Sequence, residues 1–237
     1  MNSNVLPRPP RRVVTAPGAD WFTQLSPHVQ GELERCMTRR RFGIGQPIYL
    51  EGDCADAMYR IASGRVRIRT VSPCGKELLM VIYGAGHCIG TVAVLDGLPR
   101  HNDAIAECKT DLHILGATDF HRVASDNPEL YKAVAVSYAM WIRDIHTMFV
   151  GGYSLEERLA RRLDFLLQFG AEKEAGSGAL RLDFTQEMLA SSIAVSRQAI
   201  SKLLQEWQDN GIIDYRYGSL VVRDRDHLRR LAGKQVN

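Results

Sequence analysis

The sequence contains no run of the ~20 unbroken apolar residues that a membrane-spanning helix needs. Its first 20 residues are polar, basic and proline-rich, and they have no apolar core of the kind found in secretion signals. We therefore expect a cytoplasmic protein that does not contact membranes. The composition is otherwise that of a globular protein, with 45% hydrophobic and 24% charged residues.

Cysteines are few, and no two of them form a Cys-x-x-Cys pair. The five positions are Cys36, Cys54, Cys74, Cys88 and Cys108. An odd number at these spacings disfavours both a disulfide framework and a tetrahedral zinc site. We expect separate structural or surface thiols and no bound metal.

Motifs of enzymes are also missing. The sequence has no Gly-x-Ser-x-Gly element, no phosphate-cradling P-loop and no His-x-His pair of the kind a cupin-like metalloenzyme needs. We therefore predict that the chain is not an enzyme, has no catalytic residues and carries no cofactor.

The charge of the chain is nearly balanced, with a formal net charge of +3. Residues 154–237 contain 13 Lys and Arg against 12 Asp and Glu, a difference of +1. Net charge alone thus does not indicate a nucleic-acid-binding protein. If the chain binds DNA, it needs a local basic surface, since only that surface faces the phosphates.

The first half of the chain has the pattern of a small β domain preceded by a flexible arm at 1–20. Leu25, Val29 and Leu33 recur every four residues and predict a short helix within 21–36. Apolar and basic residues then alternate over 64–71, which is typical of a half-buried strand. Further β-rich runs occur at 77–83, 102–108 and 111–115, separated by glycine-containing turns. These features predict a β-roll or barrel-like domain over 21–125.

A long helix follows, starting at Asp126-Asn127-Pro128, because proline after Asp or Asn is a helix start signal. An apolar stripe runs along it through Leu130, Val134, Tyr138, Trp141, Ile145 and Met148. About six turns is typical of a coiled-coil-like dimerisation helix, and the alternative is a helix packed on its own core. Gly151-Gly152 would form a hinge. Dimerisation helix and hinge are thus expected over 126–152.

The last part, 153–237, has the pattern of a winged helix-turn-helix. Ser154 and Glu157 form a capping box that opens a leucine-rich helix. Thr185 and Ser196 are N-cap residues of two short helices joined by a tight turn, and Gly211 ends the second helix. Residues 212–223 then read as strand, glycine turn and strand, which is a wing. We predict the helix-turn-helix over 185–210.

The second of these helices has the residues of a DNA reader in its first turns. Arg197 is suited to bidentate contact with guanine and Gln198 to pairing with adenine in the major groove. Such a helix enters the groove with its N-terminus first. The remaining predicted DNA contacts are groove contacts by Ser201 and Lys202 and phosphate contacts by Thr185, Ser196 and Arg216.

An ordered set of short motifs joins the two halves. The sensor half contains Tyr49-Leu-Glu-Gly-Asp53, Tyr59-Arg-Ile-Ala-Ser-Gly64, Gly75-Lys-Glu77, Gly86-His-Cys-Ile-Gly90 and Asp126-Asn-Pro128. The DNA half contains Arg158-Leu-Ala, Val195-Ser-Arg-Gln-Ala-Ile-Ser-Lys202, Gly211-Ile-Ile213 and Asp226-His-Leu-Arg-Arg-Leu-Ala232. In this order and spacing the chain resembles the cAMP receptor protein/fumarate–nitrate regulator (CRP/FNR) family of bacterial transcription factors, over roughly residues 21–232.

The resemblance implies an α+β fold with an N-terminal cyclic-nucleotide-binding-type β-roll, a long dimerisation helix and a C-terminal winged helix-turn-helix. It also implies a homodimer that binds an inverted-repeat operator in double-stranded DNA, with RNA polymerase as a partner. Gln198 and Lys202 depart from the Glu and Arg of the family's reader helix, so we expect a different half-site.

The sensor half departs from the cAMP-binding members of the family. Thr91 stands where those members have the glutamate that binds the ribose. With one extra loop residue, Asn102-Asp103 stand at the Arg-Ser positions that hold the cyclic phosphate, and without it His101-Asn102 do, with Arg100 one or two places off. A carboxylate against the phosphate and the loss of the arginine would cost about 2–5 kcal/mol. We predict that cAMP is not the effector, and both an unknown small molecule and constitutive activity stay open.

Other members of the family that this chain resembles sense through an iron–sulfur cluster or haem. The first 35 residues contain no cysteine, which disfavours the iron–sulfur cluster of some family members. His87 and Cys88 lie where haem-binding members have ligands, and the alternative is that they are ordinary roll residues. Arg143 and Asp144 are either effector contacts or part of a solvated helix face.

The competing function is a cyclic-nucleotide-type regulatory module that acts through protein partners. That function leaves the helix-turn-helix and the wing unexplained.

Overall fold

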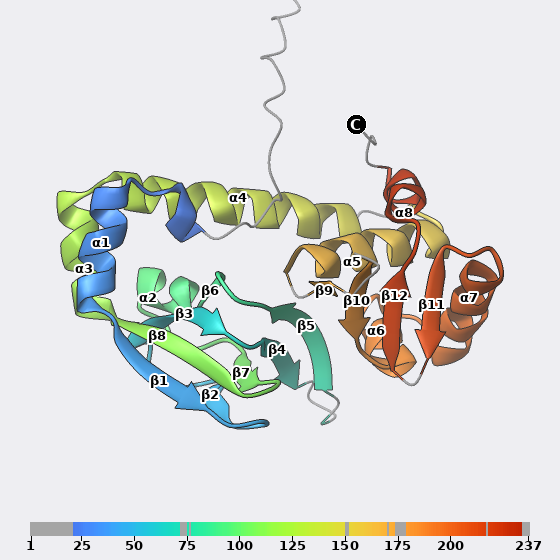
Figure 1. Ribbon diagram of the computed structural model, residues 1–237, viewed down its shortest axis with the longest axis horizontal. Helices are drawn as coiled ribbons and strands as arrows, with labels where there is room; N and C mark the ends of the chain where they lie inside the picture. Colours follow the sequence, from blue (N-terminus) through green and yellow to red (C-terminus); the bar gives the residue numbers. More distant parts are fainter. Residues whose placement is uncertain are drawn as a thin grey trace, which may run out of the picture.

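The computed structural model describes residues 21–71, 75, 77–149, 152–169, 171–173, 179–216 and 218–233 (Figure 1). The predicted arm at 1–20, Gly151 of the predicted hinge and the side chains of Ile145 and Met148 lie outside this description. Among the described helices, none combines the length and the apolar character that crossing a membrane demands.

A roll of two antiparallel four-stranded sheets forms the first half of the molecule, with strand orders β1-β8-β3-β6 and β2-β7-β4-β5. Its strands are β1 (Thr38–Phe42), β2 (Pro47–Tyr49), β3 (Ala57–Ser63), β4 (Val66–Val71), β5 (Glu77–Tyr83), β6 (Cys88–Ile89), β7 (Asp103–Ala106) and β8 (Thr110–Gly116). Val66 and Ile68 point into the roll and the intervening Arg67 does not, as the alternating pattern predicts.

Short helices close one end of the roll. They are the 3-10 helix η1 (Trp21–Gln24), α1 (Pro27–Cys36), α2 (Thr91–Asp96) and α3 (Ala117–Asp126). The helix predicted within 21–36 is thus divided, because Pro27 stands in the first turn of α1 and starts it afresh. Trp21, Phe120 and Leu130 belong to one buried cluster that joins these helices to the long helix.

The long helix α4 (Glu129–Phe149) runs across both halves of the molecule (Figure 1). Four residues of its predicted dimer stripe, Leu130, Val134, Tyr138 and Trp141, pack on this chain's own core. These four residues therefore agree with the alternative interpretation, in which the helix packs on its own core. A different set of apolar side chains on α4, including Val136 and Ile142, is exposed.

The second half contains α5 (Leu155–Phe169), α6 (Gln186–Ser192), α7 (Arg197–Asp209) and α8 (Arg225–Leu231) around a small sheet. The predicted wing strands β11 (Ile213–Arg216) and β12 (Ser219–Val222) are joined there by β10 (Leu180–Asp183) and β9 (Glu172–Lys173), in the order β11-β12-β10-β9. The capping box of α5 is formed. The Glu157 N–H donates to Ser154 Oγ at 3.1 Å, and the Ser154 N–H donates to Glu157 Oε2 at 2.7 Å.

Candidate DNA interface and sensor cavity

Local hydrogen bonds fix the two helices of the helix-turn-helix. Thr185 Oγ1 accepts from the N–H of Met188, and Ser196 Oγ accepts from the N–H of Ala199, each at 3.2 Å. Both predicted N-caps are therefore formed. In the turn between the helices, Ala194 has a φ of 53°, a left-handed conformation that costs a residue with a Cβ roughly 1–2 kcal/mol.

The buried face of α7 anchors the recognition helix to its domain. Ile200, Leu204 and Trp207 are at most 2% exposed. The Trp207 indole N–H donates to Glu156 in α5 at 3.0 Å, so the helix is held by a polar contact as well as by packing. This anchoring determines which face of α7 is left for a partner.

The opposite face of α7 carries the predicted reader residues. Arg197, Gln198 and Lys202 are exposed, and Ser201 is half-buried. Lys202 Nζ lies 3.9 Å from Glu206, an exposed pair that holds the lysine only weakly. The structure thus brings these four side chains together on the first turns of one helix.

The wing lies beside α7 (Figure 1). Its hairpin turns at Gly218, which has a φ of 81°. Arg216, the predicted backbone contact, is exposed at the end of β11. An ion pair between Arg223 and Asp214 at 2.8 Å ties the other end of the hairpin.

A cavity of about 70 Å³ lies between the roll, α2 and the long helix. Its polar and aromatic lining comprises Tyr49, Tyr83, Arg100, His101, Asn102, Tyr138 and Trp141. Burial raises the pKa of Tyr49, Tyr83 and Tyr138, so these phenols are neutral at physiological pH.

Among the described residues, Arg100 is the one strongly basic side chain of this lining, and it is 3% exposed. Its Nη1 donates to the carbonyl oxygen of Gly90 at 2.7 Å, and its Nη2 donates to that of Ala57. The guanidinium also lies over the ring of Tyr49, 4.5 Å from the centroid. Counting positions along the loop put Arg100 outside the phosphate site, whereas the folded loop turns it into the cavity.

Of the predicted effector residues, Asn102 lines the cavity and accepts from the Tyr49 hydroxyl at 3.4 Å. Thr91, the first residue of α2, is buried and is not among the residues that line the cavity. Arg143 is exposed and does not line the cavity, and the side chain of Asp144 lies outside the described part of the structure.

Asp103 does not face the cavity. Its carboxylate accepts from the N–H of Glu51 at 2.9 Å and forms an ion pair with Arg69 at 3.1 Å. The Asp103 carboxylate is therefore directed to the other side of its strand and not toward the cavity.

The two residues considered as haem ligands differ in position. Cys88 lines the cavity and is half-buried. The ring of His87 is tilted by 40° against that of Tyr83 at a centroid distance of 5.5 Å, and its Nδ1 lies 3.1 Å from the carbonyl oxygen of Gly84. Within the described residues, no group of three or more His, Cys, Asp or Glu is arranged to hold a metal ion.

A β-roll with an internal cavity, a long helix and a winged helix-turn-helix define a DNA-binding regulator with a sensor domain. Residues 39–127 match the cyclic nucleotide-binding domain family, and residues 157–231 match the Crp-like helix-turn-helix domain family. The chain belongs to the CRP/FNR family of transcriptional regulators, which are DNA-binding proteins and not enzymes.

Relatives match over nearly their whole length. The chain is 25% identical over 213 residues to the CRP-like cAMP-activated global transcriptional regulator of Mycobacterium tuberculosis, covering 89% of this chain and 95% of the relative. It is 26% identical over 217 residues to the cyclic AMP receptor protein of Thermus thermophilus, covering 91% and 97%. A solved CRP/FNR-family regulator from the same organism superposes with a TM-score of 0.62 at 25% identity, covering 83% and 99%.

Proposed function

We propose that this regulator binds an inverted-repeat operator as a homodimer, with one α7 in each of two successive major grooves. The observation that carries the proposal is the exposed row of Arg197, Gln198 and Lys202 on a helix that is capped and anchored from behind. Members of the CRP/FNR family bind DNA as dimers. Two-fold symmetry then sets half-sites about 34–36 Å apart.

Each predicted contact has a distinct task in this arrangement. Arg197 reads guanine and Gln198 reads adenine, with Ser201 and Lys202 one turn further along. The Thr185 and Ser196 oxygens accept the cap hydrogen bonds, so their own hydroxyl hydrogens are free to donate to phosphates. Arg216 would contact the backbone from the wing. RNA polymerase is the further partner we expect, as the resemblance to the family implies.

The sensor of this regulator is not operated by cAMP, on this proposal. A cavity of about 70 Å³ is far below the about 300–1,000 Å³ of ordinary ligand sites. Thr91 replaces the ribose-binding glutamate, and the Arg100 guanidinium is engaged by protein carbonyls. We also propose that the chain carries no iron–sulfur cluster, because the first 35 residues contain no cysteine.

Selection from a pool of random double-stranded DNA with the purified protein tests the DNA-binding part. We expect enrichment of a two-fold symmetric site. Enrichment of no sequence would instead support the alternative of a regulatory module that acts through protein partners. A calorimetric titration with cAMP tests the sensor part, and saturable binding at micromolar concentration would contradict it.

A further inference from the structure

The DNA-binding half docks on β5, an edge strand of the roll (Figure 1). Val81 and Ile82 of β5 belong to the same continuous buried cluster as Leu163 of α5 and Leu189 of α6. An exposed edge strand is a liability that proteins commonly cover with another element. Here the covering elements are α5 and α6, so the sensor and the helix-turn-helix share a core.

A buried arginine fastens α5 to this edge. Arg162 is 5% exposed, and its Nη2 donates to the carbonyl oxygen of Met80 at 2.6 Å. Met80 is the extra residue of a β-bulge, since Val81 pairs with Ile68 and Leu79 pairs with Arg69. A bulge leaves its extra residue outside the hydrogen-bond ladder of the strand pair. Arg162 donates to the carbonyl oxygen of this extra residue, Met80.

Burial lowers the pKa of Arg162 to about 10, so the side chain is still a cation at neutral pH. Burying a cation is costly unless hydrogen bonds compensate it. We therefore expect the packing of α5 on β5 to depend on the hydrogen bond between Arg162 and Met80. Met80 is also one of the residues that line the sensor cavity, so one residue contacts both the cavity and the DNA-binding half.

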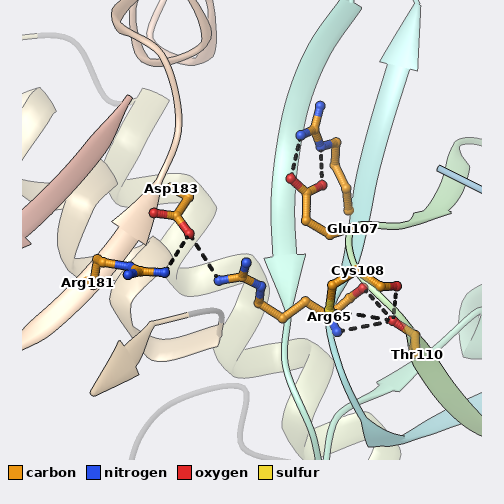
Figure 2. A network of polar contacts seen from close by, with 7 residues as sticks. Arg65, Glu107, Cys108, Thr110, Arg181 and Asp183 are labelled. Atoms are coloured by element: carbon orange, nitrogen blue, oxygen red, sulfur yellow. Dashed lines mark hydrogen bonds and ion pairs between the residues drawn. The ribbon is translucent and has the colours of Figure 1, made fainter. Parts of the chain in front are cut away.

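An ion pair fastens the start of the helix-turn-helix at a second point (Figure 2). Arg65 Nη1, at the entry to β4, lies 3.4 Å from Asp183 Oδ2, at the end of β10. Arg181 holds the same carboxylate at 3.3 Å. Asp183 stands two residues before Thr185, the N-cap of α6, so the pair acts close to the first residue of the helix-turn-helix.

The base of Arg65 is itself fixed. The Thr110 hydroxyl donates to the Arg65 carbonyl oxygen at 3.0 Å (Figure 2). The preceding Gly64 has a φ of 87°, and a Cβ at this position would lie only 2.5 Å from the Thr110 hydroxyl oxygen. Only glycine fits that turn without strain. The Arg65 side chain therefore extends from a fixed backbone position toward Asp183.

We propose that Arg162 and the Arg65–Asp183 pair are positioning residues, which set the orientation of the helix-turn-helix on the roll. The Arg162 contact acts through α5, and the Arg65–Asp183 pair acts through the residues just before α6. The reader residues of α7 stay exposed. In a dimer, this orientation fixes the spacing of the two recognition helices. The consequence for operator binding rests on the dimeric function proposed above, whereas the docking itself does not.

Hydrogen–deuterium exchange of the full-length protein tests the docking without any DNA. In Asp183→Asn and in Arg162→Met, we expect amides of β5 and α6 to exchange about tenfold faster or more. Arg162→Lys, which keeps a cationic donor, should recover part of the protection. The matched control is Glu107→Gln, which removes the carboxylate that binds Arg67 at 2.6 Å within the roll and should leave α6 unchanged.

DNA binding by the same variants tests the positioning. Affinity for a single half-site should stay within about twofold of the parent, while affinity for the full operator should change by about fivefold or more. A parallel loss for both DNAs would contradict positioning. Unchanged exchange at β5 and α6 in Asp183→Asn would overturn the proposal even if Arg162→Met does not fold. Failure to find any operator would count against the proposed function and not against the docking.

Discussion

At the scale of single residues, the reader side chains of α7 determine what this regulator can recognise. Arg197 and Gln198 occupy the first turn, where a helix entering the major groove meets base edges. Gln198 offers both a donor and an acceptor to adenine, which a carboxylate does not. The half-site should therefore contain a guanine and an adenine at adjacent contacted positions.

Replacing Arg197 by alanine should weaken specific binding by about 1–3 kcal/mol and relax the preference at a single base pair. Fluorescence anisotropy on the selected site and on single-base variants measures both effects. Arg216→Ala is the matched control, because loss of a phosphate contact should weaken all sequences uniformly and lower the salt slope by about one. If Arg197→Ala keeps the parent's discrimination at every base, another residue reads the guanine.

At the scale of elements, β8 places His113 between two arginines of its neighbouring strands. Arg39 of β1 and Arg60 of β3 stand opposite His113 in the sheet. Burial first, and then these two charges, lower the pKa of His113 below its ordinary value of 6.5, against a smaller opposing effect of Glu34. The protonated ring is therefore less favourable in the folded state than in the unfolded chain.

This shift predicts a pH-dependent stability. Because the folded pKa is depressed, the full stability is present above the unfolded pKa of 6.5. It decreases as the pH falls from there toward the folded pKa, since the unfolded state takes up the proton first. Urea unfolding at a series of pH values measures the slope. His113→Gln should flatten it between neutral pH and the folded pKa, and an unchanged slope would assign the effect to other groups.

The helix starts that local sequence patterns predicted are determined by local interactions. The caps at Ser154, Thr185 and Ser196 involve partners only three residues away, and the structure forms all three. The helix α3, the strands β9 and β10 and the division at Pro27 were not predicted. The wing strands β11 and β12 are marked in the sequence by the glycine turn between them, whereas the pairing of β10 with β12 spans the whole helix-turn-helix.

The candidate site was only partly accessible from sequence for the same reason. Counting along the loop placed Asp103 in the sensor site and Arg100 outside it, because loop length alone does not tell which side chains turn inward. The buried position of Arg100 depends on carbonyls at Gly90 and Ala57, the second of them 43 residues away in the chain. Arg162 was missed because its partner, a bulge carbonyl in β5, exists only in the folded sheet.

At the scale of the whole molecule, the long helix α4 packs on this chain's own core and also exposes other apolar side chains. Leu130 and Val134 are buried within the chain, whereas Val136 is 41% and Ile142 is 52% exposed. Members of the CRP/FNR family bind DNA as dimers, and an exposed apolar side chain such as Ile142 is a position that a partner copy can cover. We therefore expect α4 to be where two copies of the chain meet.

Ile142→Glu should shift the protein from dimer toward monomer, because a charge would be buried at the interface without a partner. Sedimentation velocity over a range of concentrations measures the change. Ile44→Glu is the matched control, since Ile44 is 73% exposed in the turn between β1 and β2, away from the long helix. A dimer that survives Ile142→Glu but dissociates with Ile44→Glu would move the interface from α4 to the roll.

Genome-wide footprinting of the bound protein tests the central claim, that a dimer reads DNA through two copies of α7. We predict protected sites built from two inverted half-sites whose centres lie about 10–10.5 base pairs apart, or a whole multiple of that spacing. The same sites should be lost with Arg197→Ala. Binding without a common sequence, or at single sites with no inverted partner, would contradict the account.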